Sequence, residues 1–327
     1  MLNAFGSARK PAMGKFIVVS GSDAAYFPLL KDWLTCIKSF SELTHCDIGI
    51  LDIGLTADQV DWVKGQGAQV VVPDWEFNFP DRHRMPPVLR AMAAKPVLPK
   101  YFPRHEIIVW LDADTWIQEP RYALLYSVGA ERFGLAITPE MDRTYPTLYG
   151  ETHPVLLQHH GAYYQCYGRH VADFLIGCPI INSGAFGIHR DHPIWKKWAQ
   201  RLSEAYTKAV LFHAEQAALN YAVYHEIETT RPHLLPSLAN WICALSLPIW
   251  SHEQRKLVEP ALPHDPIGII HLTSVRKATI GTTDHSSIDV LLTYSGIKAM
   301  SEARHSPAFM PFAGIDTNRN IGPLLSK

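Results

Sequence analysis

The length, composition and charge of the chain exclude several classes of protein. It has 327 residues, of which 47% are hydrophobic and 19% are charged, as is usual for a globular chain with a full core. Its formal net charge of -1 lacks the basic excess of a protein that binds nucleic acid. No apolar run approaches the roughly 20 residues that span a bilayer. We therefore expect neither a nucleic-acid partner nor a transmembrane segment.

The cysteines give no sign of a disulfide framework or a zinc knuckle. They are odd in number, widely spaced and never arranged as Cys-x-x-Cys, which fits a reducing compartment. The five are Cys36, Cys46, Cys166, Cys178 and Cys243. We expect a cytoplasmic protein, at most peripheral to the membrane, because no basic or aromatic amphipathic tail argues for firm attachment.

The first third of the chain alternates strands with helices. Short apolar runs predict strands at residues 16–20, 47–52, 68–72 and 107–111. Apolar residues at helical spacing predict helices at residues 26–40, 56–64 and 88–95, the second of them capped by Thr56. This alternation predicts an α/β fold whose open, mostly parallel sheet carries helices on both faces.

The pattern is looser in the rest of the chain. Residues 138–165, rich in tyrosine and histidine, are predicted to be a long irregular segment that either covers an acceptor or is a packed surface loop. Further strands are predicted at residues 185–189 and 268–271, and further helices at 193–208, 213–224 and 287–304. Prolines and glycines in residues 305–327 predict a loosely packed tail.

The strand predicted at residues 107–111 ends in two carboxylates, Asp112 and Asp114, separated by Ala113. Alternate residues of an extended chain point to the same side, so both carboxylates can face one divalent cation. Parallel strands also present their carboxyl ends to the crevice in which ligands bind. Alternatively, one acid caps the following helix and the other is solvated.

Three later segments carry residue types that bind ligands. Asn182-Ser183-Gly184 precedes an apolar strand with small residues, which let the backbone approach a ligand closely. Glu215 and Gln216 lie on a predicted helix, and His271 ends a strand six residues before Lys277. The plain alternatives are a structural turn, a solvated acid and a structural histidine.

These four motifs, in this order and spacing, resemble the family 8 glycosyltransferases, retaining enzymes of the GT-A fold that include galactosyltransferases and glycogenin. The family has Asp-x-Asp after a strand, then Asn-x-Gly, Asp-Gln-Asp-x-Leu-Asn and His-x-x-Gly-x-x-Lys-Pro-Trp. The resemblance covers residues 16 to 277. It implies one GT-A domain with a nucleotide-binding half at residues 15–120, a sugar and acceptor half at 121–285, and a C-terminal helix and tail at 286–327.

The resemblance also implies roles for particular residues. Asp112, Asp114 and His271 would hold Mn²⁺, or Mg²⁺ at lower affinity, together with the phosphates of a nucleotide sugar. The nucleotide sugar would also contact Ser20, Asp23, Tyr26, Lys95, Ala113 and Lys277. Lys95 has a plain alternative, a solvated cation at a helix end. Asn182, Glu215 and Gln216 would lie beside the transferred sugar or its acceptor.

The implied activity is metal-dependent transfer of a hexose from a nucleotide sugar, expected to be a UDP-sugar, to a saccharide or other hydroxyl acceptor. Retention by double displacement needs a carboxylate on the far face of the sugar, and the family pattern puts Gln216 near that face. Front-side departure and attack, in which the leaving phosphate takes the acceptor proton, is therefore the favoured hypothesis.

The sequence departs from the family pattern in its later motifs. Ser274 replaces a glycine after His271, Ala278-Thr279 replaces Pro-Trp, and Ala217 replaces the second acid of Asp-Gln-Asp. Three other functions stay open. They are a GT-A-type nucleotidyltransferase, a non-catalytic binder of nucleotide sugars or glycans, and, least favoured, a phosphohydrolase of the haloacid dehalogenase type.

Overall fold

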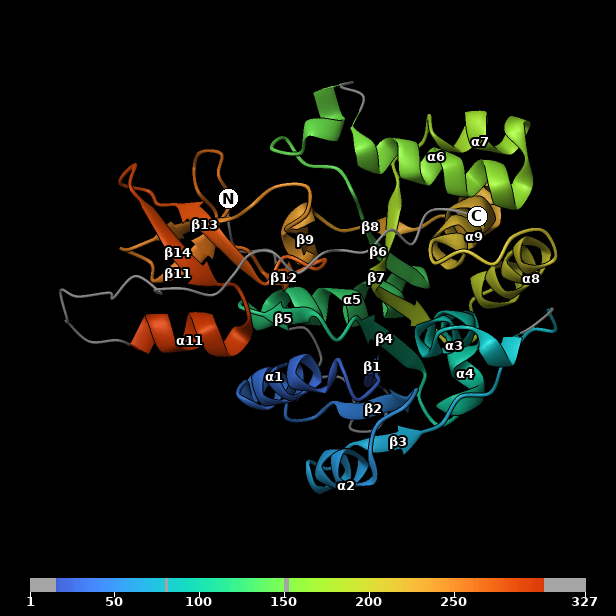
Figure 1. Cartoon of the computed structure of the whole chain (residues 1–327), viewed down its shortest axis with the longest axis horizontal. Coiled ribbons are helices and arrows are strands. Elements are labelled where there is room, and N and C mark those ends of the chain that lie inside the picture. The colour runs from blue at the N-terminus through green and yellow to red at the C-terminus, as the bar shows by residue number, and fades with distance from the viewer. Residues whose placement is uncertain (1–15, 80–81, 150–152, 303–327) are drawn as a thin grey trace.

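A seven-stranded sheet forms the centre of the computed structural model, which describes residues 16–79, 82–149 and 153–302 (Figure 1). Its strands, in spatial order, are β3 (Gln69–Val71), β2 (Asp47–Asp52), β1 (Phe16–Ser22), β4 (Ile107–Leu111), β7 (Ile181–His189), β6 (Leu135–Pro139) and β8 (His233–Leu234). The first four are parallel, whereas β7 is antiparallel to both of its neighbours. The predicted mostly parallel sheet is confirmed.

Helices cover both faces of this sheet. One face packs against α1 (Phe27–Lys38), α2 (Ala57–Gly65) and α5 (Pro120–Phe133). The other packs against α3 (Pro87–Ala94), α4 (Leu98–Tyr101), α8 (Ile194–Tyr206) and α9 (Ala214–His225). Strand β4 needs a helical layer on each side because its apolar side chains point to both faces of the sheet. Val109 and Leu111 enter the first core, whereas Ile108 and Trp110 enter the second. The predicted α/β class is confirmed.

Smaller elements surround the central sheet. A three-stranded sheet joins β5 (Thr115–Ile117), β12 (Ile269–His271) and β9 (Trp241–Ile242). Two strand pairs follow, β10 (Ile249–Ser251) with β11 (Lys256–Val258), and β13 (Lys277–Gly281) with β14 (Ser287–Leu291). The remaining helices are α6 (Pro154–Tyr167), α7 (Arg169–Leu175), α10 (Ile227–Thr230) and α11 (Tyr294–Glu302). Short 3-10 turns span Ser41–Leu43, Arg82–Arg84, Lys95–Val97, Pro146–Tyr149 and Ser237–Ala239.

Two predicted elements are wrong. The segment at residues 138–165 was expected to be irregular, yet its second half forms helix α6, which packs beside α7 at the top of Figure 1. Residues 287–291, expected to begin the last helix, form strand β14 because its partly or fully buried residues, Ile288 and Val290, alternate with exposed ones. The predicted tail at residues 305–327 lies outside the described residues. Among the described residues, no helix has both the length and the apolar composition needed to cross a bilayer.

Candidate functional site

A cleft of about 720 Å³ opens at the carboxyl ends of β1 and β4. Its walls include Gly21 and Ser22 from β1, the segment Asp112–Asp114 after β4, and the first turn of α9. Open α/β sheets bind ligands at this edge, because loops and side chains converge where parallel strands end. The cleft also falls within the size range of small-molecule sites.

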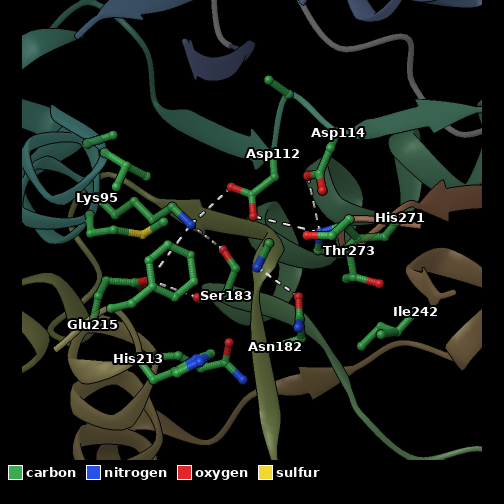
Figure 2. Close-up of a pocket in the computed structure, with 18 of the residues that line it drawn as sticks. Lys95, Asp112, Asp114, Asn182, Ser183, His213, Glu215, Ile242, His271 and Thr273 are labelled. Carbon is green, nitrogen blue, oxygen red and sulfur yellow. Dashed lines mark hydrogen bonds and ion pairs between the residues drawn. The ribbon is translucent and has the colours of Figure 1, made fainter. Parts of the chain in front are cut away.

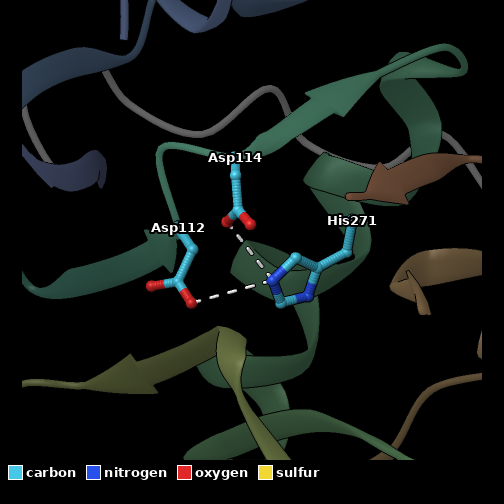
Figure 3. Close-up of side chains that lie close together, drawn as sticks. All are labelled: Asp112, Asp114 and His271. Carbon is cyan, nitrogen blue, oxygen red and sulfur yellow. Dashed lines mark ion pairs between the residues drawn. The ribbon is translucent and has the colours of Figure 1, made fainter. Parts of the chain in front are cut away.

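Asp112, Asp114 and His271 all line the cleft, and Figure 3 shows their side chains close together. Strand pairing explains this, because β12 runs antiparallel to β5 with His271 opposite Thr115, the residue that follows Asp114. His271 Nε2 lies 3.4 Å from Asp114 Oδ1 and 3.9 Å from Asp112 Oδ2. One possible ligand atom from each of the three residues lies within 4.8 Å of the other two. The fold therefore brings together the three predicted metal ligands, although His271 is far from the two aspartates in sequence.

Asn240 fixes the orientation of the His271 ring. Its Oδ1 lies 3.1 Å from His271 Nδ1, so the amide oxygen accepts a hydrogen bond from the N–H of that nitrogen and leaves Nε2 facing the two carboxylates. Burial opposes a charge on the ring, but Asp114 and Asp112 raise the pKa of His271 overall. Burial likewise opposes ionisation of Asp114, yet the His271 ring holds the pKa of Asp114 below its ordinary value.

Lys95 is a buried cation beside Asp112, one of the three predicted metal ligands (Figure 2). Its Nζ lies 3.0 Å from Asp112 Oδ1, 3.7 Å from Glu215 Oε2 and 3.1 Å from the Ser183 carbonyl oxygen. Burial alone would lower the pKa of Lys95, but Asp112 and Glu215 raise it overall. The plain alternative of a solvated lysine is wrong, because the side chain is only 1% exposed.

Glu215 lies on the first turn of α9 and is almost fully buried in the cleft wall. Its Oε2 accepts a hydrogen bond of 2.9 Å from Ser183 Oγ, whereas its Oε1 has no hydrogen-bond partner among the residues that the structure describes. Burial raises the pKa of Glu215 to about 7, although Lys95 and Ser183 pull it down. A buried acceptor without a partner is suited to a hydroxyl of a bound ligand. The alternative of a solvated acid is wrong for this residue.

We predict that Glu215→Gln weakens the pH dependence of stability in the metal-free protein. The folded-state pKa of about 7 exceeds the ordinary 4.5, so the folded state binds this proton more tightly than the unfolded state does. The resulting stabilisation is fully present below pH 4.5 and is lost as the pH rises through 7. Urea unfolding at pH 5 and pH 8 should show a fall in stability smaller by about 2–3 kcal/mol in the variant. An unchanged pH dependence in the variant would contradict the raised pKa of Glu215.

Asn182 and Gln216 both line the cleft and both bind one carboxylate, that of Glu140. Asn182 Nδ2 donates to Glu140 Oε1 over 2.8 Å, and Gln216 Nε2 donates to the same oxygen over 2.7 Å. Asn182 Oδ1 accepts from the Gly184 N–H and from Asn240 Nδ2. The turn proposed as the plain alternative for Asn182 is excluded, because the residue lies within strand β7.

The residues predicted to contact the nucleotide divide into two groups. Asp23, Tyr26 and Ala113 line the cleft, and Asp23 Oδ1 accepts from the Tyr26 N–H over 2.9 Å. Ser20 is fully buried within β1 and Lys277 is exposed at the start of β13, and neither lines the cleft. The nucleotide-binding roles of these five residues and of Lys95 stay predictions.

The loop between β12 and β13 reaches the cleft through Thr273 and Ser274. Both residues have positive φ, 44° and 75°, a conformation that glycine adopts without steric cost. A glycine at the position of Ser274, as in the family pattern that the sequence resembles, would adopt this conformation without that cost. Farther along the loop, the guanidinium of Arg276 lies 5.4 Å from the centre of the ring of Tyr26, a residue that lines the cleft.

Sequence reasoning missed several residues of the cleft. Glu140 follows β6, a strand that the pattern did not predict, and Asn240 directly precedes β9, which was not predicted either. His159 and His213 also line the cleft, with ring centres 5.8 Å apart. A signal for His159 existed, because His159, Ala162, Tyr163 and Cys166 repeat at helical spacing and form the buried face of α6.

Comparisons with known proteins found solved structures that are similar to this chain at low sequence identity. No protein-family model and no curated protein matches the chain. A structure of an active-site mutant of LgtC is 13% identical with a TM-score of 0.48, covering 78% of this chain and 86% of that one. The galactosyltransferase LgtC in complex with donor and acceptor sugar analogs is 15% identical, with a TM-score of 0.46 and the same coverage. Mouse xyloside xylosyltransferase 1 is 12% identical with a TM-score of 0.48, covering 79% and 97%. Similarity at this level does not bear on activity.

Proposed function

We propose that the chain is a metal-dependent, retaining glycosyltransferase of the GT-A fold. It would move a hexose from a UDP-sugar to a saccharide or other hydroxyl acceptor. The observation that carries this proposal is the convergence of Asp112, Asp114 and His271 in one cleft with Lys95 and Glu215. The order and spacing of these residues in the sequence, which resemble family 8 glycosyltransferases, support it.

The chemistry of the donor set suits Mn²⁺ or Mg²⁺. Two carboxylates and one imidazole are hard or borderline ligands, and three protein ligands leave coordination positions for phosphate oxygens. Asn240 accepts a hydrogen bond from Nδ1 of His271, so Nε2 of the same ring can act as a metal ligand. When bound, such an ion would supply positive charge that stabilises the leaving diphosphate.

The chain's own residues would divide the remaining work. Asp23 and Tyr26 would contact the nucleoside, and Lys95 would place its charge beside the sugar and diphosphate. Glu215 would accept a hydrogen bond from a sugar hydroxyl through its unpartnered Oε1. The nucleotide-binding half at residues 15–120 and the sugar and acceptor half at residues 121–285 would thus face each other across the cleft. The acceptor proton would leave on the departing phosphate.

A thermal-shift experiment on the full chain tests the proposal. UDP at about 100 times its Kd should stabilise the protein by about 2.7 kcal/mol in Mn²⁺ and have little effect in EDTA. ADP and GDP serve as matched nucleotides. A panel of UDP-sugars should then show release of UDP as the sugar is transferred to water or to a saccharide acceptor. Absence of any nucleotide response would refute the proposal, and release of pyrophosphate from a nucleoside triphosphate and sugar phosphate would identify a nucleotidyltransferase.

A further inference from the structure

Glu140 is a carboxylate in the cleft that the proposed function has not used. It directly follows β6, and its backbone N–H donates to the Ile180 carbonyl oxygen over 2.7 Å, which anchors it beside the start of β7. The side chain is 6% exposed and lines the same cleft as the metal cluster. Burying an ionised carboxylate is unfavourable unless several hydrogen-bond donors surround it. The donors around Glu140 therefore show which ionisation state of this carboxyl group the site stabilises.

Three side chains from three different elements donate to this carboxylate or pair with it. Asn182 of β7 and Gln216 of α9 both donate to Oε1, and Nε2 of His159 in α6 lies 3.4 Å from Oε2. Burial alone would raise the pKa of Glu140, but the His159 ring and the two amides hold it below its ordinary value. The environment therefore keeps Glu140 ionised and fixes one of its oxygens, while the other faces only a longer contact.

A continuous chain of polar contacts connects Glu140 to His271, one of the three proposed metal ligands. His271 Nδ1 contacts Asn240 Oδ1 at 3.1 Å, and Asn240 Nδ2 donates to Asn182 Oδ1 over 2.9 Å. Asn182 Nδ2 then donates to Glu140. Two buried asparagines thus set the position of the carboxylate relative to the metal ligands. A purely structural ion pair between α6 and the sheet would not require this connection.

We infer that Glu140 is a catalytic carboxylate, which places its negative charge beside the anomeric carbon of the transferred sugar. This inference rests on the proposed function. As the bond from the anomeric carbon to the diphosphate oxygen breaks, its electron pair leaves with the diphosphate and positive charge develops on the sugar. A carboxylate that is already held in place and only 6% exposed stabilises that charge without reorganising. Asn182, Gln216 and His159 are then positioning residues that act through Glu140.

The role of Gln216 changes accordingly. On the sequence alone, Gln216 was placed at the reacting face, where an amide is a poor nucleophile. The structure shows its Nε2 donating to Glu140, so a carboxylate lies next to the position that the family pattern assigns to the glutamine. The charge at this part of the site comes from Glu140, and the amide orients it.

The test compares Glu140→Gln with wild type, using the UDP-sugar that the wild-type enzyme hydrolyses fastest and following UDP release. Loss of the charge should lower kcat by about 100-fold or more, the size of effect seen for preorganised groups that stabilise a transition state. KM for the donor should change less than about threefold. The thermal shift with UDP and Mn²⁺ should persist, which would show that the nucleotide half is intact. Glu253→Gln, an exposed glutamate outside the cleft, is the matched control.

His159 provides a second readout if Glu140→Gln does not fold. His159→Leu should lower kcat about tenfold at unchanged donor KM, and His159→Gln should restore most of it, because an amide can again donate to Oε2. Full activity in either Glu140→Gln or His159→Leu, with the UDP response intact, would overturn this assignment but leave the proposed function standing. A wild-type protein with neither a nucleotide response nor UDP release would overturn both.

Discussion

Asp114→Asn is expected to lose Mn²⁺ binding and, with it, the stabilisation by UDP. Asp114 is one of three residues whose ligand atoms lie within 4.8 Å of one another, and its carboxylate lies 3.4 Å from His271 Nε2. An amide oxygen is a weaker ligand than a carboxylate, and the variant also removes one negative charge from the site. Changes in groups that only support metal ligands weaken binding by about 10–100-fold, so loss of a direct ligand should reach at least the upper end of that range.

Mn²⁺ affinity can be measured directly, by following the electron paramagnetic resonance signal of the free ion during a titration. The variant should keep its fold, because the asparagine has nearly the same shape as the aspartate. Asp61→Asn, an exposed change on α2, controls for loss of a carboxylate elsewhere. If Asp114→Asn bound Mn²⁺ with wild-type affinity, the three-residue cluster could not be the metal site.

The parts of the fold that the sequence predicted best are those with simple periodicity. Strand β2 has the predicted bounds, and Thr56 caps α2 with its side chain as expected, accepting from the Gln59 N–H. Helix α6 was missed because its buried face includes His159 and Tyr163, residues that a polarity pattern counts as exposed. Local pattern cannot show that such side chains are buried by helices distant in sequence.

In the candidate site, too, the residues that could be predicted are those that lie in recognisable sequence patterns. The three proposed metal ligands carry recognisable motifs, so they could be predicted before the fold was known. Glu140 and Asn240 carry no motif, and they reach the site only through the position of β6 and the pairing of β9 with β12. The resemblance to the family implied a role for Lys95, but its burial between two carboxylates depends on tertiary packing. Groups that orient other groups are thus the hardest to find from a sequence.

Gly184 is predicted to be essential to the metal site, although it has no side chain. A Cβ atom placed on this residue would lie 2.9 Å from Asp112 Oδ2 and 2.8 Å from Asn182 Oδ1, and it would clash with the His271 ring. The backbone of Gly184 is also fixed, because its carbonyl oxygen accepts from the Asp112 N–H over 2.8 Å. Since the backbone cannot move away, the side chains of the cluster must shift in Gly184→Ala.

We expect Gly184→Ala to lower Mn²⁺ affinity by at least about tenfold, because the ligands are displaced while their chemistry is unchanged. The crowding should also cost about 1–3 kcal/mol of stability without metal. Gly161→Ala is the matched control, since a Cβ at that position on α6 meets nothing within 4 Å. That change should instead stabilise the protein by about 0.5–1 kcal/mol, as alanine does in a helix. Wild-type Mn²⁺ affinity in Gly184→Ala would show that the ion binds away from Asp112 and His271.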